Sequence, residues 1–214
     1  MGLILPGSTS GSVTVNPPAV AGSTVLTLPG TSGNIPVSAY TGGFSPNTLM
    51  YALNSGLAGA NATGAQNIFG VGVTLVAGTV YEFEAVVALS KSAGVTSHTV
   101  SLGFGGTATL NNIGYNVNLA TSPTSFTSLS AVNGLSIFIQ TASATVVSGA
   151  ITSTTQFEEL LIKGTVSINA GGTFIPQYTL SAAPGGAYTT AAGSYIKLTP
   201  VAASGANVSI GTWA

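Results

Sequence analysis

The sequence lacks cysteine, aspartate and arginine, and it has very little charge of either sign. An ordinary globular domain is about 25% charged, whereas the charged fraction of this 214-residue chain is 3%. The charged residues are Glu82, Glu84, Glu158, Glu159, Lys91, Lys163 and Lys197.

Each absence removes a class of function. Without cysteine the chain has no disulfide, no thiolate zinc site and no thiol nucleophile. Three lysines cannot form the basic patch that binds phosphates, so we expect no nucleic-acid partner. No stretch of about 18 apolar residues runs without Ser, Thr, Gly or Pro, so we expect no helical membrane span and no membrane partner. Residues 3–5 are too short for the apolar region of a signal peptide, so we expect none.

The low charge needs a positive explanation. Disordered chains are rich in charge and poor in apolar residues, whereas 45% of this chain is hydrophobic. The cores of protein–protein interfaces are depleted in charge, and a free monomer with a net charge of -1 would be prone to association. We therefore expect other protein to cover much of the surface.

Residues 161–201 carry the clearest structural pattern. Apolar and polar side chains alternate over 165–169, 173–180 and 195–199, and Gly171-Gly172 and Pro184-Gly185-Gly186 separate these segments. Alternation bounded by Gly and Pro is typical of antiparallel strands. The pattern predicts three strands joined as a meander, with positive φ available at Gly171-Gly172.

The same alternation recurs elsewhere and predicts an all-β fold. Residues 71–89 place Tyr81, Phe83, Ala85, Val87 and Leu89 on one face. Further strands are predicted at 99–104, 108–110, 115–119, 126–129, 135–140, 144–147, 157–168 and 207–213. This spacing predicts an antiparallel β-sandwich or jelly roll over residues 71–214. Residues 1–70 are expected to form an extended N-terminal arm (1–48), with extended segments at 12–15 and 24–28, and a loop region (49–70) with at most a short helix.

The carboxylates have a catalytic interpretation and a simpler one. Glu82 and Glu84 lie two residues apart, and hence on one face of a strand, and Glu158-Glu159 could add a third carboxylate. A glycosidase needs its two carboxylates across a cleft, which is a different geometry. The simpler interpretation is a solvated face, or pairing with Lys163 or Lys91 on a neighbouring strand.

His98 is the one histidine of the chain. A single histidine cannot form a closed metal site, and no aspartate is present to complete a Ser–His–Asp relay. We expect His98 to be a hydrogen-bonded strand or turn residue. We predict no enzymatic activity, no cofactor and no metal.

Two parts of the chain resemble a known family. Residues 11–29, GSVTVNPPAVAGSTVLTLP, resemble a segment of tailed-bacteriophage structural proteins in which a "PA.AG..TLTLP" core recurs. Residues 81–110 and 164–183 are similar to a virion-protein module of environmental and cyanobacterial phages. The resemblance implies a virion protein that is trimeric and jelly-roll-like, either on the head or in a tail appendage. Because the "TLTLP" segment begins almost at Met1 with no shaft repeat before it, we expect a small decoration protein rather than a long fibre.

These observations lead to one functional expectation and one alternative. We expect a capsid decoration, or cement, protein that forms a homotrimer on the capsid exterior and binds the major capsid protein. The alternative is a receptor-binding protein of a tail fibre or tailspike, which would recognise host polysaccharide through loops near 111–115 or 184–188. Candidate interface residues are the apolar residues of the arm and the aromatic residues of the charge-free regions: Val13, Val15, Val25, Leu26, Leu28, Tyr40, Phe44, Tyr51 and Trp213.

Overall fold

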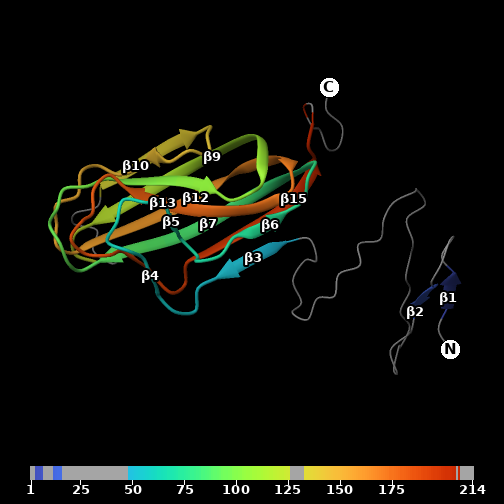
Figure 1. Ribbon diagram of the computed structural model, residues 1–214, viewed down its shortest axis with the longest axis horizontal. Coiled ribbons are helices and arrows are strands. Elements are labelled where there is room, and N and C mark those ends of the chain that lie inside the picture. Colours follow the sequence, from blue (N-terminus) through green and yellow to red (C-terminus); the bar gives the residue numbers. More distant parts are fainter. Residues whose placement is uncertain (1–2, 7–11, 16–47, 126–132, 206, 208–214) are drawn as a thin grey trace. The chain divides into compact units, whose positions relative to one another are not determined.

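The computed structural model describes residues 3–6, 12–15, 48–125, 133–205 and 207, which form strands, turns and loops without a helix (Figure 1). The chain divides into two compact units, Met1–Ala39 and Tyr40–Ala214. In the first unit, β1 (Leu3–Pro6) pairs antiparallel with β2 (Ser12–Val15). The extended segment predicted at 12–15 is therefore confirmed, and the one predicted at 24–28 lies outside the described residues.

The second unit is built from two antiparallel sheets. The larger sheet has eight strands: β3 (Leu49–Ala52), β4 (Leu57–Ala58), β7 (Thr79–Lys91), β9 (Thr109–Ser122), β10 (Asn133–Ile139), β12 (Gln156–Ala170), β14 (Thr189–Thr190) and β15 (Tyr195–Ala203). The smaller sheet has five: β5 (Gln66–Asn67), β6 (Val73–Leu75), β8 (Val100–Gly105), β11 (Thr145–Val146) and β13 (Gly172–Leu180).

The long strands of the larger sheet lie in the order β10-β9-β12-β7, and β7 then pairs with β15 and β14 at different points along its length. Beyond β15 comes β3, and beyond β14 comes β4. In the smaller sheet β13 pairs with β5, β6 and β8, and β11 pairs with β8.

The core lies between the two sheets, and aromatic rings from both meet in it. On β7 the five side chains predicted to share a face are all buried. Phe83 of β7 meets Phe104 of β8 at 5.4 Å and Phe174 of β13 at 6.0 Å between ring centroids, and Phe104 stacks on Phe174 at 4.6 Å. A buried Phe stabilises a fold by about 1.5–3 kcal/mol. The predicted antiparallel β-sandwich is therefore confirmed.

The predicted meander is wrong, although its three strands exist. β12 pairs with β7 and β9 in the larger sheet, β13 lies in the smaller sheet, and β15 returns to pair with β7. Alternation identifies a strand and its buried face, but it carries no information about the partner strand. The chain crosses between sheets at Gly171-Gly172, and neither glycine has a positive φ. Gly172 is needed for a close approach instead, since a Cβ there would lie 2.6 Å from the Ala108 nitrogen.

The loop region predicted at 49–70 is also wrong, because it contains β3, β4 and β5. The sandwich thus includes residues that precede Val71. These strands are two to four residues long, and their partners β15, β14 and β13 lie more than 100 residues away in the sequence. Such short strands depend on tertiary pairing, so the local pattern with its glycines gives no sign of them.

The remaining strand predictions hold in outline. Those at 99–104, 135–140, 144–147 and 157–168 correspond to β8, β10, β11 and β12. The two segments predicted at 108–110 and 115–119 are one continuous strand, β9. The strand predicted at 126–129 lies outside the described residues. The same is true of the one predicted at 207–213, except for residue 207.

Candidate functional site

The carboxylates on the outer face of β7 belong to ion pairs. Glu82 lies 3.4 Å from Lys163 of β12, and Glu84 lies 3.4 Å from Lys197 of β15. The Tyr195 hydroxyl donates to Glu84 Oε1 at 2.9 Å, and together with Lys197 it lowers the pKa of Glu84 against the opposing effect of burial. A carboxyl group with a lowered pKa is ionised at neutral pH and is a poor general acid. The predicted pairing with Lys163 is confirmed.

Glu158 is separate from this face. The two residues of the Glu158-Glu159 pair point to opposite faces of β12, and Glu158 is fully buried in the core. Its Oε1 accepts hydrogen bonds from Thr121 Oγ1 at 2.9 Å and from Gln156 Nε2 at 2.8 Å, while Oε2 has no hydrogen-bond partner. Burial raises the pKa of Glu158 to about 7, although both hydrogen bonds lower it. The chain therefore carries a buried carboxyl group that titrates near neutrality.

His98 is the hydrogen-bonded residue that its sequence context predicts. It is buried, with Nδ1 2.7 Å from the Thr96 carbonyl oxygen and Nε2 2.9 Å from the Tyr188 hydroxyl. Because a carbonyl oxygen can only accept, Nδ1 carries the proton, and neutral Nε2 accepts from Tyr188. Burial lowers the pKa of His98. Burial also raises the pKa of Tyr188, and the nearby charge of Glu158 raises it further.

Lys91 is the other buried charge, and sequence reasoning missed its role. Its Nζ donates to the carbonyl oxygens of Ala93, Gly94, Ser153 and Thr154, and the contact with Gly94 measures 2.9 Å. Burial lowers the pKa of the ammonium group. The contacts connect the end of β7 to the segment that precedes β12. The phase of the β7 pattern could have revealed this burial, since Lys91 continues the series of alternate buried residues that begins at Tyr81.

With Lys91 and Glu158 buried, the five other charged residues all lie on one surface. Glu82 and Glu84 on β7, Glu159 and Lys163 on β12, and Lys197 on β15 alternate with buried residues, so they project from the outer face of the larger sheet. Because these seven are all the charges in the sequence, the outer face of the smaller sheet carries none.

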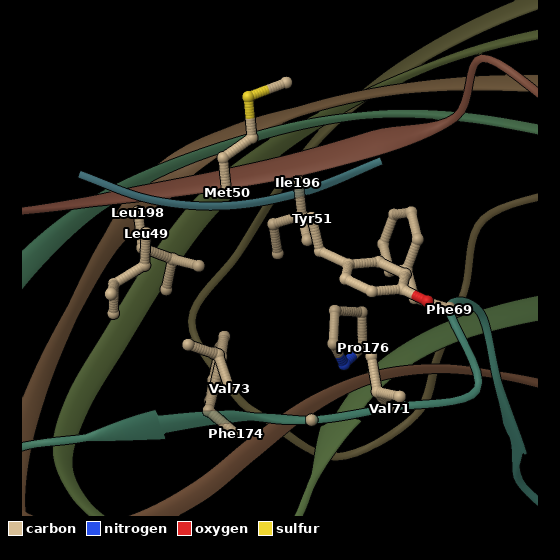
Figure 2. A pocket seen from close by; sticks show the side chains of 11 residues that line it. Leu49, Met50, Tyr51, Phe69, Val71, Val73, Phe174, Pro176, Ile196 and Leu198 are labelled. Carbon is tan, nitrogen blue, oxygen red and sulfur yellow. The ribbon is translucent and has the colours of Figure 1, made fainter. Parts of the chain in front are cut away.

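An apolar groove opens where β3 and β15 of the larger sheet diverge from β6 and β13 of the smaller sheet (Figure 2). We call it the β3 groove; its volume is about 210 Å³. Leu49 and Tyr51 point into it while Met50 points away, as the alternation of a strand requires. The Tyr51 ring meets Phe69 edge-on at 6.2 Å. The lining consists of Leu49, Met50, Tyr51, Phe69, Val71, Gly72, Val73, Phe174, Pro176, Ile196 and Leu198.

A second hollow, of about 370 Å³, lies where β12 begins and has a more polar character. We call it the polar hollow. Its lining includes Thr121, Ser148, Ser153 and Gln156, together with Ile151. Thr121 and Gln156 are also the residues that hold Glu158.

Of the interface residues predicted from sequence, one can be placed on a surface. Tyr51 is 42% exposed at the β3 groove. Val13 and Val15 lie on β2 of the first unit. The others, Val25, Leu26, Leu28, Tyr40, Phe44 and Trp213, lie outside the described residues. Residues 111–115, predicted to form a recognition loop, belong to strand β9, and Tyr188 of the second predicted loop is buried.

Within the described ranges, no three His, Cys, Asp or Glu residues come together in a way that could hold a metal ion. None of the described segments forms a helix long and apolar enough to span a membrane. The fold and these surfaces define an antiparallel β-sandwich whose charges, apart from the buried Lys91 and Glu158, lie on one face. A comparison with protein-family models found no match, and a comparison with curated proteins found none either.

Proposed function

We propose that the chain is a structural protein of a tailed-bacteriophage virion, and specifically a decoration, or cement, protein on the outside of the assembled head. In this proposal the sandwich is jelly-roll-like, the protein is a homotrimer, and its partner is the major capsid protein. The resemblance of residues 11–29, 81–110 and 164–183 to phage virion proteins suggests the class.

The observation that carries the proposal is the confinement of exposed charge to one face. Glu82, Glu84, Glu159, Lys163 and Lys197 lie on the outer face of the larger sheet, and the rest of the surface carries no charged residue. A surface that becomes buried against protein benefits from the absence of charge, because an unpaired charge is costly to desolvate. We interpret the charged face as the one that stays in water.

The binding energy would come from apolar area and main-chain pairing. Buried apolar surface contributes about 25 cal/mol per Å² before the costs of association, and a stable interface buries about 1,200–2,000 Å² in total. A protein that binds the assembled lattice but not free subunits stabilises the lattice by mass action. The proposal therefore requires binding that depends on assembly.

The test is addition of the purified protein to heads that lack it. We expect it to sediment with assembled heads, to raise their temperature of rupture, and to leave unassembled major capsid protein unbound. Heads that have bound the added protein should show extra density on their exterior by electron microscopy. Equal binding to assembled and unassembled capsid protein, or no binding to heads, would contradict the proposal.

The alternative function, a receptor-binding protein of a tail fibre or tailspike, has one observation in its favour. The lining of the polar hollow contains hydroxyl- and amide-bearing residues of the kind that bind neutral sugars. The polar groups of Thr121, Ser153 and Gln156 are bonded within the chain, however, and no aromatic residue is there for a sugar ring to stack on. Copy number separates the two functions. Hundreds of copies in a purified virion support decoration of the head, and about a dozen support a tail appendage.

A further inference from the structure

We propose that copies of this chain associate head to tail, with the β10 edge of one copy docking beside β3, at the β3 groove of the next copy, so that three copies close into a ring. The inference rests on the homotrimer of the proposed function and specifies the surfaces that build it. The partner is a second copy of this chain.

The larger sheet has one edge at β10 and another on the side where β3 and the two-residue β4 lie. Within the described chain, β10 pairs with β9 alone and β3 pairs with β15 alone. They lie on opposite sides of the sandwich, at the two ends of the path β10-β9-β12-β7-β15-β3 (Figure 1). Unpaired strand edges present backbone donors and acceptors that a further strand can satisfy.

The directions of β10 and β3 allow the two edges to pair between copies. Every neighbouring pair along this path is antiparallel. Because the path contains an even number of strands, β10 and β3 run in opposite directions. Copies related by rotation about an axis roughly parallel to the strands would therefore bring β10 of one copy antiparallel to β3 of the next. Such a head-to-tail contact forms a ring when the rotation closes.

The faces of the two edges also match. Leu135 lies opposite Leu119, which is buried, so it projects from the inner face of β10, where it is 42% exposed. In the proposed pairing it would extend the apolar surface of the β3 groove beside Leu49 and Tyr51. Phe138 projects from the outer face and would lie beside Met50.

Both edges carry exposed apolar side chains. Phe138, 61% exposed, and Tyr51, 42% exposed, are the exposed aromatic side chains among the described residues, with one at each edge. Met50 is 56% exposed at the same edge as Tyr51. Aromatic residues and Met are enriched in protein–protein interfaces.

The charges are compatible with this contact. Neither β10 nor the lining of the β3 groove contains a charged residue. The nearest charge to β3 is Lys197 on the adjacent strand, and it is paired with Glu84 on the outer face. Association would bring two neutral edges together and would bury no uncompensated charge.

A cross-linking experiment on the purified full chain tests the contact. Because the chain contains no native cysteine, each single-cysteine variant carries one thiol. Met50→Cys and Ser136→Cys place one thiol at each edge, both on the outer face. When the two variants are mixed and treated with a short bifunctional maleimide, we expect links in quantity between position 50 of one variant and position 136 of the other, identified by mass spectrometry. Links of each variant mainly with itself would overturn the proposal, because they indicate that each edge pairs with its own kind. An absence of links would also overturn it.

Native mass spectrometry of the unmodified chain and of a matched pair of variants completes the test. We expect a trimer for the unmodified chain, and at least tenfold weaker association for Phe138→Asp. Val95→Asp adds the same charge at a side chain that is 65% exposed and lies in the loop between β7 and β8, outside both β3 and β10, and it should associate like the unmodified chain. A monomer for the unmodified chain, or equal association of both variants, would refute the contact. Failure of the head-binding experiment would leave these results unaffected, so the two proposals can fail separately.

Discussion

The buried carboxyl group of Glu158 predicts an unusual dependence of stability on pH. The residue is fully buried, its Oε2 has no hydrogen-bond partner, and burial raises its pKa from 4.5 to about 7. The informative change is Glu158→Gln, which keeps the size of the side chain and the Oε1 acceptor for Thr121 and Gln156 but removes the titration.

The direction of the pKa shift decides whether stability rises or falls with pH. A carboxyl group whose pKa is raised by folding favours the folded state fully below pH 4.5, and this contribution is lost as the pH rises through about 7. One pKa unit corresponds to about 1.4 kcal/mol, so the rise for Glu158 corresponds to about 3 kcal/mol. We therefore expect Glu158→Gln to unfold with a free energy close to that of the unmodified chain at pH 4, and about 3 kcal/mol larger at pH 8.

His98 acts in the opposite direction but does not obscure the result. Burial lowers its pKa, so its contribution to stability is present above its ordinary pKa and is lost as the pH falls through the lowered value. The unmodified chain and Glu158→Gln both contain His98. The difference between their free energies of unfolding therefore isolates Glu158.

The measurement is urea denaturation of both proteins across pH 4–8. Glu159→Gln is the matched control, because Glu159 is the next residue on β12 and projects from the outer face; we expect its stability to follow the unmodified chain at every pH. A difference between Glu158→Gln and the unmodified chain that stays constant across this range would refute the reasoning.

Three further changes test the packing, each by urea denaturation at pH 7. Lys91→Met leaves four carbonyl oxygens without their donor. We expect it to lower the free energy of unfolding by about 3 kcal/mol or more. A loss below about 1 kcal/mol would show that water replaces the ammonium group. Gly172→Ala places a methyl group 2.6 Å from the Ala108 nitrogen and should destabilise by about 2 kcal/mol or more, whereas Gly64→Ala, with open space around it, should have little effect. Tyr115→Phe removes a buried hydroxyl group that has no hydrogen-bond partner and should be neutral or stabilising by about 1 kcal/mol; clear destabilisation would indicate a bound water at this hydroxyl group.

The faces of the long strands were predictable from sequence alone. Alternation on β7 correctly placed every second residue from Tyr81 to Leu89 in the core, and it placed Glu82 and Glu84 on the outer face. This works because successive side chains on a strand point to opposite sides, and only one side of a two-sheet fold is buried.

Strand partners were not predictable, because pairing depends on residues far apart in the chain. The segments at 165–169 and 173–180 look like a hairpin, yet they lie in different sheets, since the chain crosses between the sheets at Gly171. The strands β3, β4 and β5 exist only through their partners. Without those partners, residues 49–70 carry the glycine-rich pattern of a loop.

The candidate site was predictable in part. Tyr51 was expected at an interface and borders the β3 groove, but its contact with a partner remains a prediction. The groove itself combines residues from β3, β6, β13 and β15, and no local pattern brings these together. Lys91 and Glu158 were interpreted as surface charges because charged residues usually lie on the surface, and this expectation was given more weight than their positions in the alternation. Both lie at positions where the alternation requires a buried side chain.

The placement of the three lysines has a consequence for proteolysis. Trypsin cleaves after lysine or arginine, and the chain contains no arginine. Lys91 is buried, Lys163 lies on β12 between β7 and β9, and Lys197 lies on β15 between β7 and β3. A protease must draw an extended segment of its substrate out of the sheet, which strands paired on both sides resist. The native protein should therefore survive digestion that would cut most proteins to small peptides, a useful property for any molecule that must persist outside a cell.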